Sequence, residues 1–213
     1  MVSRSPGVAA ILKETRTIPV VFVHVADPVR SGFVSAFARP GGNVTGFANF
    51  EPSMGGKWVE VLKEISQNVR RVLLLFNPDT AADAAYFPSL NAAAPSAAVE
   101  LFPAPVYSPA EIENAIQAFG QEPNAGAIIF PDIYMVVHRQ LVIGLVAKYG
   151  VPAVYGYRFF VRDGGLVSYG IDDHDPLRRA PSYVDRILKG AKPSELPVQG
   201  PITAGPTGLR EPG

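Results

Sequence analysis

The segment Arg71-Val72-Leu73-Leu74-Leu75-Phe76 carries an uninterrupted run of apolar residues, and Asn77-Pro78 closes it. A strand with one face in water alternates apolar with polar residues, whereas a strand that is buried on both faces is apolar throughout. Continuous apolar strands are typical of parallel sheets that helices cover on both sides. This segment therefore predicts a parallel α/β sheet with helices on its two faces.

Other short, β-branched or apolar runs predict further strands on both sides of this segment. They cover residues 18–25, 98–102, 127–130 and 153–155. The stretches between them have helical periodicity: Trp58, Val61, Leu62 and Ile65 recur at the spacing of one helical face. Strands that alternate with amphipathic helices predict a doubly wound α/β fold.

Two helices carry signals at their ends. Ser108-Pro109-Ala110-Glu111 combines a capping hydroxyl, a proline in the first turn and a glutamate three residues after the serine, which is the pattern of a capping box. A helix is therefore predicted to begin at Pro109. A second is predicted over 176–189, with Asp175 as its N-cap, although Pro181 would kink or destabilise it.

The residues after this last helix, 191–213, are rich in glycine and proline and have no periodicity. Such a composition does not bury enough apolar surface to offset the entropy of ordering the chain. We expect this segment to be an extended or disordered tail.

The composition points to a small ligand. Of the 213 residues, 47% are hydrophobic and 18% are charged, and 19 Lys and Arg balance 19 Asp and Glu. With no excess of positive charge, the electrostatic attraction that drives binding to nucleic acids or anionic membranes is missing. A neutral or zwitterionic small molecule is the partner that this balance favours.

The sequence contains no cysteine, which excludes disulfides, thiolate metal ligands and a lipid-modified N-terminal cysteine in this chain. The first residues lack the apolar run of about 7–15 residues that a secretory signal needs. No segment approaches the roughly 20 apolar residues of a membrane span. Taken as it stands, the chain is expected to remain in the cytoplasm.

No motif predicts an enzyme, a cofactor or a metal site. The glycine-rich string Arg39-Pro40-Gly41-Gly42-Asn43-Val44-Thr45-Gly46 matches neither the dinucleotide fingerprint nor the phosphate loop, and it predicts a turn into a crossover strand. His24, His138 and His174 lack paired metal-ligand spacing, and no Gly-x-Ser-x-Gly elbow occurs. We expect a protein that binds rather than catalyses.

Candidate ligand-binding residues follow the predicted strands, because open α/β sheets bind ligands beyond the carboxyl ends of their strands. Two tyrosines in the densest aromatic cluster, Tyr155 and Tyr157, would form an aromatic wall, although core packing also accounts for aromatic residues in this cluster. The full candidate set is Asp27, Asn77, Asp132, Tyr155, Tyr157, Arg158 and Tyr169.

Several motifs resemble those of one known family. They are Thr17-Ile18-Pro19-Val20-Val21-Phe22, Asp27-Pro28-Val29, the glycine-rich string extended to Ala38, Gly164-Gly165-Leu166-Val167-Ser168-Tyr169-Gly170, and the segment 183–193 that begins Tyr183-Val184-Asp185-Arg186. In this order they resemble the ABC-transporter substrate-binding family that includes the tryptophan-binding TrpX-like proteins. The resemblance covers roughly residues 8–198.

The resemblance implies a periplasmic binding protein fold: two Rossmann-like lobes with parallel sheets that hold an amino acid or related solute and dock on an ABC permease in the periplasm or at the membrane. On this template, residues 1–46 are a partial first lobe, 47–167 the second lobe, 168–190 the return to the first, and 191–213 the tail. Asp132 could then pair with a ligand ammonium and Asn77 with its carboxylate, while the alternative for Asp132 is a helix cap.

Family members begin with further β-α units and a signal, and they end with another hinge strand and helix, so we expect the first lobe to be incomplete and the chain truncated at both ends. Strand 18–25 would then present an unpaired apolar surface and promote self-association. The alternative function is a cytoplasmic sensor or interaction domain that has kept the fold and lost transport.

Overall fold

The computed structural model describes residues 1–208 except 4, 26, 50, 52, 81, 82, 173 and 202, and for 83, 84 and 203–205 it describes the backbone alone. The chain forms two compact units. The first unit comprises Met1–Glu51 and Ile171–Thr203, and the second comprises Pro52–Gly170 and Ala204–Gly213.

The first unit is built on a parallel sheet in the order β1-β2-β3, with one helix packed on each face. Alternate residues of β2 point to opposite faces: Val20 and Phe22 pack with α1, and Val21 and Val23 pack with α8. The elements of this unit are β1 (Val2–Ser3), α1 (Ser5–Glu14), β2 (Val20–Val25), β3 (Val44–Ala48), α8 (Asp175–Leu188) and the 3-10 helix η1 (Pro193–Glu195).

Strand β2 is therefore the centre of this sheet and does not expose an apolar surface. It pairs with β1 on one side and β3 on the other, and its valines and Phe22 are at most 5% exposed. The expected unpaired surface on this strand is wrong, because helices α1 and α8 cover both faces. Self-association stays a prediction, but an exposed apolar surface on β2 no longer supports it.

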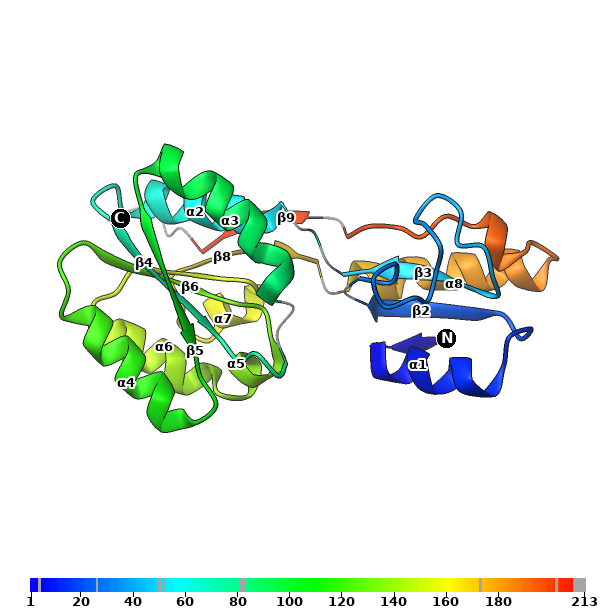
Figure 1. Ribbon diagram of the computed structural model, residues 1–213, viewed down its shortest axis with the longest axis horizontal. Coiled ribbons are helices and arrows are strands. Elements are labelled where there is room, and N and C mark those ends of the chain that lie inside the picture. Colours follow the sequence, from blue (N-terminus) through cyan, green and yellow to red (C-terminus); the bar gives the residue numbers. More distant parts are fainter. Residues whose placement is uncertain are drawn as a thin grey trace. The chain divides into compact units, whose positions relative to one another are not determined.

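The second unit holds a larger sheet in the order β5-β4-β6-β7-β8-β9, with the neighbours from β5 to β8 all parallel. Helices α2 and α3 lie on one face and α4 and α6 on the other (Figure 1). The elements are α2 (Met54–Ile65), β4 (Arg71–Phe76), α3 (Asp83–Ala97), β5 (Glu100–Pro105), α4 (Pro109–Gly120), β6 (Ala125–Ile129), α5 (Ile133–Val137), α6 (Arg139–Lys148), β7 (Ala153–Tyr155), α7 (Arg158–Arg162), β8 (Val167–Ile171) and β9 (Thr203–Thr207).

The predicted fold class, two-lobed α/β with parallel sheets, is confirmed. Strands β4 and β7 have the predicted bounds, and β2, β5 and β6 differ from prediction by a few residues at one or both ends. The Ser108 hydroxyl caps α4 by accepting a bond from the Glu111 N–H at 3.3 Å, as predicted, but the Glu111 carboxylate reaches back to the N–H of Tyr107. The last helix begins one residue early, with His174 as its N-cap instead of Asp175.

The C-terminal segment is not a disordered tail over the residues that the structure describes. Leu196 and Val198 are buried in the first unit, the Gln199 N–H donates to the Gly46 carbonyl at 2.9 Å, and the Ala48 N–H donates to the Gln199 carbonyl at 2.9 Å. Beyond these, β9 adds a strand next to β8. Burial of Leu196 and Val198 and the backbone bonds to β3 order this segment despite its composition. Residues 209–213 lie outside the described range.

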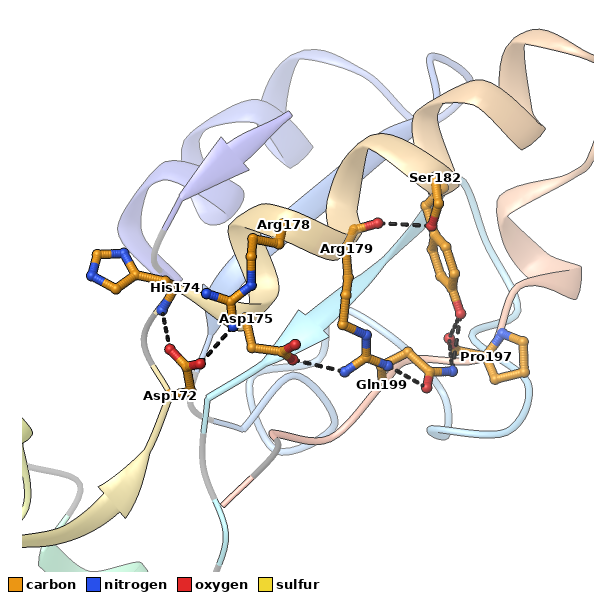
Figure 2. Close-up of polar contacts among 9 residues, drawn as sticks. Asp172, His174, Asp175, Arg178, Arg179, Ser182, Pro197 and Gln199 are labelled. Atoms are coloured by element: carbon orange, nitrogen blue, oxygen red, sulfur yellow. Dashed lines mark hydrogen bonds and ion pairs between the residues drawn. The ribbon is translucent and has the colours of Figure 1, made fainter. Parts of the chain in front are cut away.

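A polar network joins α8 to this C-terminal segment (Figure 2). The Arg179 guanidinium bonds the Asp175 carboxylate at 2.9 Å and the Gln199 side-chain oxygen at 2.9 Å, and it lies 5.0 Å from the centre of the Phe47 ring. The Gln199 amide in turn donates to the Tyr183 hydroxyl at 3.0 Å. The network fixes the C-terminal segment, α8 and β3 to one another where the chain leaves the first unit.

Candidate functional site

Asp132 connects two loops at the carboxyl edge of the second sheet. Its Oδ1 accepts bonds from the Met135 N–H at 2.8 Å and the Thr80 hydroxyl at 3.2 Å, and its Oδ2 accepts from the Asn77 N–H at 3.2 Å. The side chain is 2% exposed. Burial raises the pKa of Asp132 above its ordinary value, against the opposing effect of these hydrogen bonds. The carboxylate thus acts as the N-cap of α5 and as a tie to the loop after β4.

Asn77 is the second buried polar residue of this edge. Its amide nitrogen donates to the Val106 carbonyl at 2.8 Å, and its amide oxygen accepts from the Asp79 N–H at 3.0 Å. The side chain therefore links the ends of β4 and β5. Asn77 and Asp132 are buried, and the exposed Thr80 donates its hydroxyl to both side chains. We call these three residues the Asn77–Asp132 cluster; it connects the loops that follow three adjacent strands.

The predicted tyrosines divide between core and edge. Tyr155 is 1% exposed and stacks on Phe160 with ring centres 5.0 Å apart, so it belongs to the core, and burial raises the pKa of its hydroxyl well above the ordinary value. Tyr157 is half-buried, stacks on Phe159, and donates its hydroxyl to the Pro131 carbonyl at 3.2 Å. Tyr157 thereby lies beside the residue that precedes Asp132.

Arg158 and Tyr169 lie apart from these contacts. Arg158 is exposed and is the first residue of α7. The Tyr169 carbonyl, within β8, accepts a bond from the Trp58 indole N–H at 2.7 Å. The structure thus brings Asn77, Asp132 and Tyr157 together around the loop after β6 and places Tyr155 in the core.

An aromatic cluster that sequence reasoning did not single out supports this edge. Phe130 stacks on Phe76 at 5.3 Å and lies 5.7 Å from Trp58, whose ring is 4.8 Å from that of Tyr86. Phe76 and Phe130 immediately precede Asn77 and Pro131. The packing of these rings fixes the ends of the two strands from which the loops at Asn77 and Pro131 begin.

The remaining predicted residue, Asp27, belongs to the first unit. Its carboxylate accepts from the Arg30 N–H at 2.9 Å, and its carbonyl accepts from the Ser31 N–H at 3.0 Å, so it opens the turn after β2. Three positions earlier in the sequence, His24 adopts a left-handed φ of 55° where the pairing of β2 with β3 shifts register. Bulges of this kind re-aim side chains at the ends of strands.

Asn49 at the end of β3 was not among the predicted residues. Its backbone N–H donates to the Val25 carbonyl at 3.0 Å, and its side-chain Oδ1 is buried with no hydrogen-bond partner. A polar residue directly after a strand was the signal that singled out Asn77, and the same signal would have found Asn49. The first unit thus has its own polar edge, formed by His24, Asp27 and Asn49.

Within the described part of the chain, no group of three or more His, Cys, Asp or Glu residues could hold a metal ion. No helix there is both long and apolar enough to cross a bilayer.

Comparison with known proteins identifies relatives along nearly the whole chain. A curated tyrosine-binding protein of Clostridioides difficile strain R20291 is 23% identical over 195 residues, which are 91% of this chain and 55% of the relative. The chain therefore spans about half the length of that protein.

Solved structures share the fold. An ABC domain from Streptococcus pneumoniae in complex with L-Trp has a TM-score of 0.80 at 24% identity, over 95% of this chain and 68% of that one. The ligand-free, open structure of a substrate-binding protein with adhesive properties from Clostridium difficile has a TM-score of 0.75 at 20% identity, over 94% and 68%. Both likenesses support the two-lobed fold.

The family model described as ABC transporter substrate binding protein matches residues 3–202. This match spans almost the whole chain, and it confirms the resemblance that the sequence motifs indicated. The chain belongs to the family of ABC transporter substrate-binding proteins.

Proposed function

We propose that this protein captures a free amino acid with an aromatic side chain and presents it to an ABC permease for import. One observation carries the proposal. Two proteins to which the chain is similar over 91% and 95% of its length are a tyrosine-binding protein and a domain in complex with L-Trp. Tyrosine and tryptophan share a zwitterionic end and a planar ring.

The carboxyl edge of the second sheet supports a zwitterionic ligand. A zwitterion needs a negative charge or acceptors for its ammonium group and hydrogen-bond donors for its carboxylate. Asp132 supplies a carboxylate in a buried site, where a charge acts over longer distances than in water.

Tyr157 supports the aromatic part of the proposal. Its ring is half-buried and is held in place by Phe159 and by the bond to the Pro131 carbonyl. A rigid aromatic face of this kind offers contact area for a planar ligand ring at little entropic cost. The predicted partner of the ligand ring at this edge is therefore Tyr157 rather than the core residue Tyr155.

A thermal-shift panel tests the proposal. We expect L-tyrosine, L-tryptophan or L-phenylalanine to raise the melting temperature, since a ligand that binds only the folded state stabilises it by mass action. Tyramine, which lacks the carboxylate, and 3-phenylpropionate, which lacks the ammonium group, serve as controls. No shift with any of the amino acids, or equal shifts with these controls, contradicts the proposal.

A further inference from the structure

We infer that the Thr80 hydroxyl, rather than the Asp132 carboxylate, contacts the ammonium group of the amino acid in the second unit. The inference rests on the proposed function and adds a residue to the same site. The observation behind it is a difference in exposure: Asp132 is 2% exposed, whereas Thr80, whose hydroxyl bonds Asp132 Oδ1 at 3.2 Å, is an exposed residue. Of this pair, Thr80 is the member that solvent, and hence a ligand, can reach.

The Asp132 carboxylate is enclosed by donors of the protein itself. Besides the Thr80 bond, Oδ1 accepts from the Met135 N–H at 2.8 Å and Oδ2 accepts from the Asn77 N–H at 3.2 Å. These two donors are backbone groups, one in the first turn of α5 and one directly after β4. A direct bond from the ligand to the carboxylate would require the loops to open, whereas a bond to the Thr80 oxygen requires no such movement.

The proton of the Thr80 hydroxyl is committed to acceptors. Its second partner is Asn77 Oδ1 at 3.3 Å. This atom is the amide oxygen, because it also accepts from the Asp79 N–H at 3.0 Å while the amide nitrogen donates to the Val106 carbonyl at 2.8 Å. A hydroxyl has one proton and two lone pairs, so a hydroxyl between two acceptors can offer a further partner only its lone pairs. Among the described residues, none donates a hydrogen bond to Thr80 Oγ1.

An oxygen that offers only lone pairs selects the ammonium end of a zwitterion. An ammonium group carries three protons to donate, and an ionised carboxylate carries none. The Asp132 charge strengthens this preference in two ways: it polarises the hydroxyl that donates to it, and it attracts a cation through the buried surroundings. Thr80 and Asp132 together therefore favour the ligand ammonium group and disfavour the ligand carboxylate.

Two substitutions of Thr80 separate its hydroxyl from its bulk. Thr80→Val removes the hydroxyl and keeps the shape of the side chain, so the Kd for the bound amino acid should increase by about tenfold, as for the loss of a bond to a charged group. Thr80→Ser keeps the hydroxyl and should keep the Kd close to that of the wild type. The melting temperature of Thr80→Val without ligand should fall only slightly, because Asp132 retains both backbone donors.

Ser108 offers a matched control at the end of the neighbouring strand β5. Its hydroxyl caps α4 by accepting from the Glu111 N–H at 3.3 Å. Ser108→Ala should therefore lower the melting temperature and leave the Kd unchanged.

A double-mutant cycle tests whether Asp132 acts through Thr80. If it does, the Kd of the double variant Thr80→Val/Asp132→Asn should increase by less than the product of the two single increases.

Isothermal titration calorimetry of these variants with whichever of L-tyrosine, L-tryptophan and L-phenylalanine the wild type binds decides the matter. Equal Kd values for the wild type and Thr80→Val, or equal losses of affinity in Thr80→Val and Thr80→Ser, overturn the role of the Thr80 hydroxyl and leave the proposed function standing. Increases that multiply in the double variant overturn it as well, because the two residues then act independently. If the wild-type protein binds none of the three amino acids, the proposed function fails, and the role of Thr80 fails with it.

Discussion

The Asp132 carboxylate accepts a hydrogen bond from the backbone N–H of Asn77 at 3.2 Å, although the two residues lie 55 positions apart in the sequence. The bond joins the loop after β4 to the loop after β6. Because Asp132 also caps α5 through the Met135 N–H, a single buried side chain orders three segments at the carboxyl edge. If Asp132 also binds the ligand, as the proposed function holds, stability and binding both depend on this one side chain.

Replacement of Asp132 by asparagine separates its charge from its capping bonds. Asparagine caps helices nearly as well as aspartate, so we expect Asp132→Asn to lose no more than about 1 kcal/mol of stability. Affinity for the amino acid should fall, because the negative charge that favours the ligand ammonium group is gone. Asp132→Leu, which removes every acceptor, should cost about 2–4 kcal/mol. Equal ligand affinity in wild type and Asp132→Asn would leave Asp132 a structural residue.

The raised pKa of Asp132 predicts a pH dependence of stability. Between the ordinary value of 3.8 and the higher value in the folded protein, the folded state binds more protons than the unfolded state. Stability from this group therefore decreases as the pH rises through that interval. Relative to Asp132→Asn, the wild type should gain stability between pH 7 and pH 4 in urea denaturation. A relative loss on acidification would show that its hydrogen bonds outweigh its burial.

The adjacent arginines of α8 should differ in their contributions to stability. Arg179 bonds Asp175, whose side chain is 9% exposed, as well as Gln199, whereas Arg178 is 60% exposed and pairs with Asp172. We expect Arg179→Leu to lower the free energy of unfolding by about 1–3 kcal/mol. Arg178→Leu should change it by less than about 1 kcal/mol. Chemical denaturation measures the free energy of unfolding of both variants. Equal losses would show that the network of Figure 2 stabilises the protein no more than the exposed ion pair does.

Glycine is required at position 46 of β3, because a side chain there would collide with the backbone of β2. A Cβ atom there would lie 2.1 Å from the Phe22 carbonyl oxygen, whereas one at Gly42 would meet nothing within 4 Å. Backbone atoms on a central strand cannot move aside easily. Gly46→Ala should therefore cost about 3 kcal/mol or more, and Gly42→Ala should be tolerated. Similar melting temperatures for the two variants would refute the close approach.

Local signals in the sequence predicted the parts of the fold that are locally determined. The apolar run 71–76 is β4, and the Ser108-Pro109 signal marks the start of α4, because burial and capping act over a few residues. Strand β9 has no such signal: Thr203–Thr207 contains glycine and proline, and its place at the end of the larger sheet comes from tertiary pairing. The Leu196 and Val198 anchors likewise depend on cores that distant segments build.

The positions of the candidate residues on the sheet were predictable from the sequence, but the directions of their side chains were not. The rule that ligands bind beyond strand ends placed Asn77, Asp132 and Tyr157 at one edge. It could not tell that the Tyr155 ring faces the core, because the face to which a strand residue points depends on a register that the sequence leaves open. Asn49 was not predicted because the glycine-rich string before it indicates a turn into a crossover strand but does not mark where that strand, β3, ends.

Isothermal titration calorimetry of the wild-type chain with L-tyrosine and L-tryptophan tests the central claim most directly. The account predicts saturable binding of at least one of them with a stoichiometry of one, and no heat from tyramine or 3-phenylpropionate at the same concentrations. A folded chain that shows no binding heat with either amino acid up to millimolar concentration would contradict it.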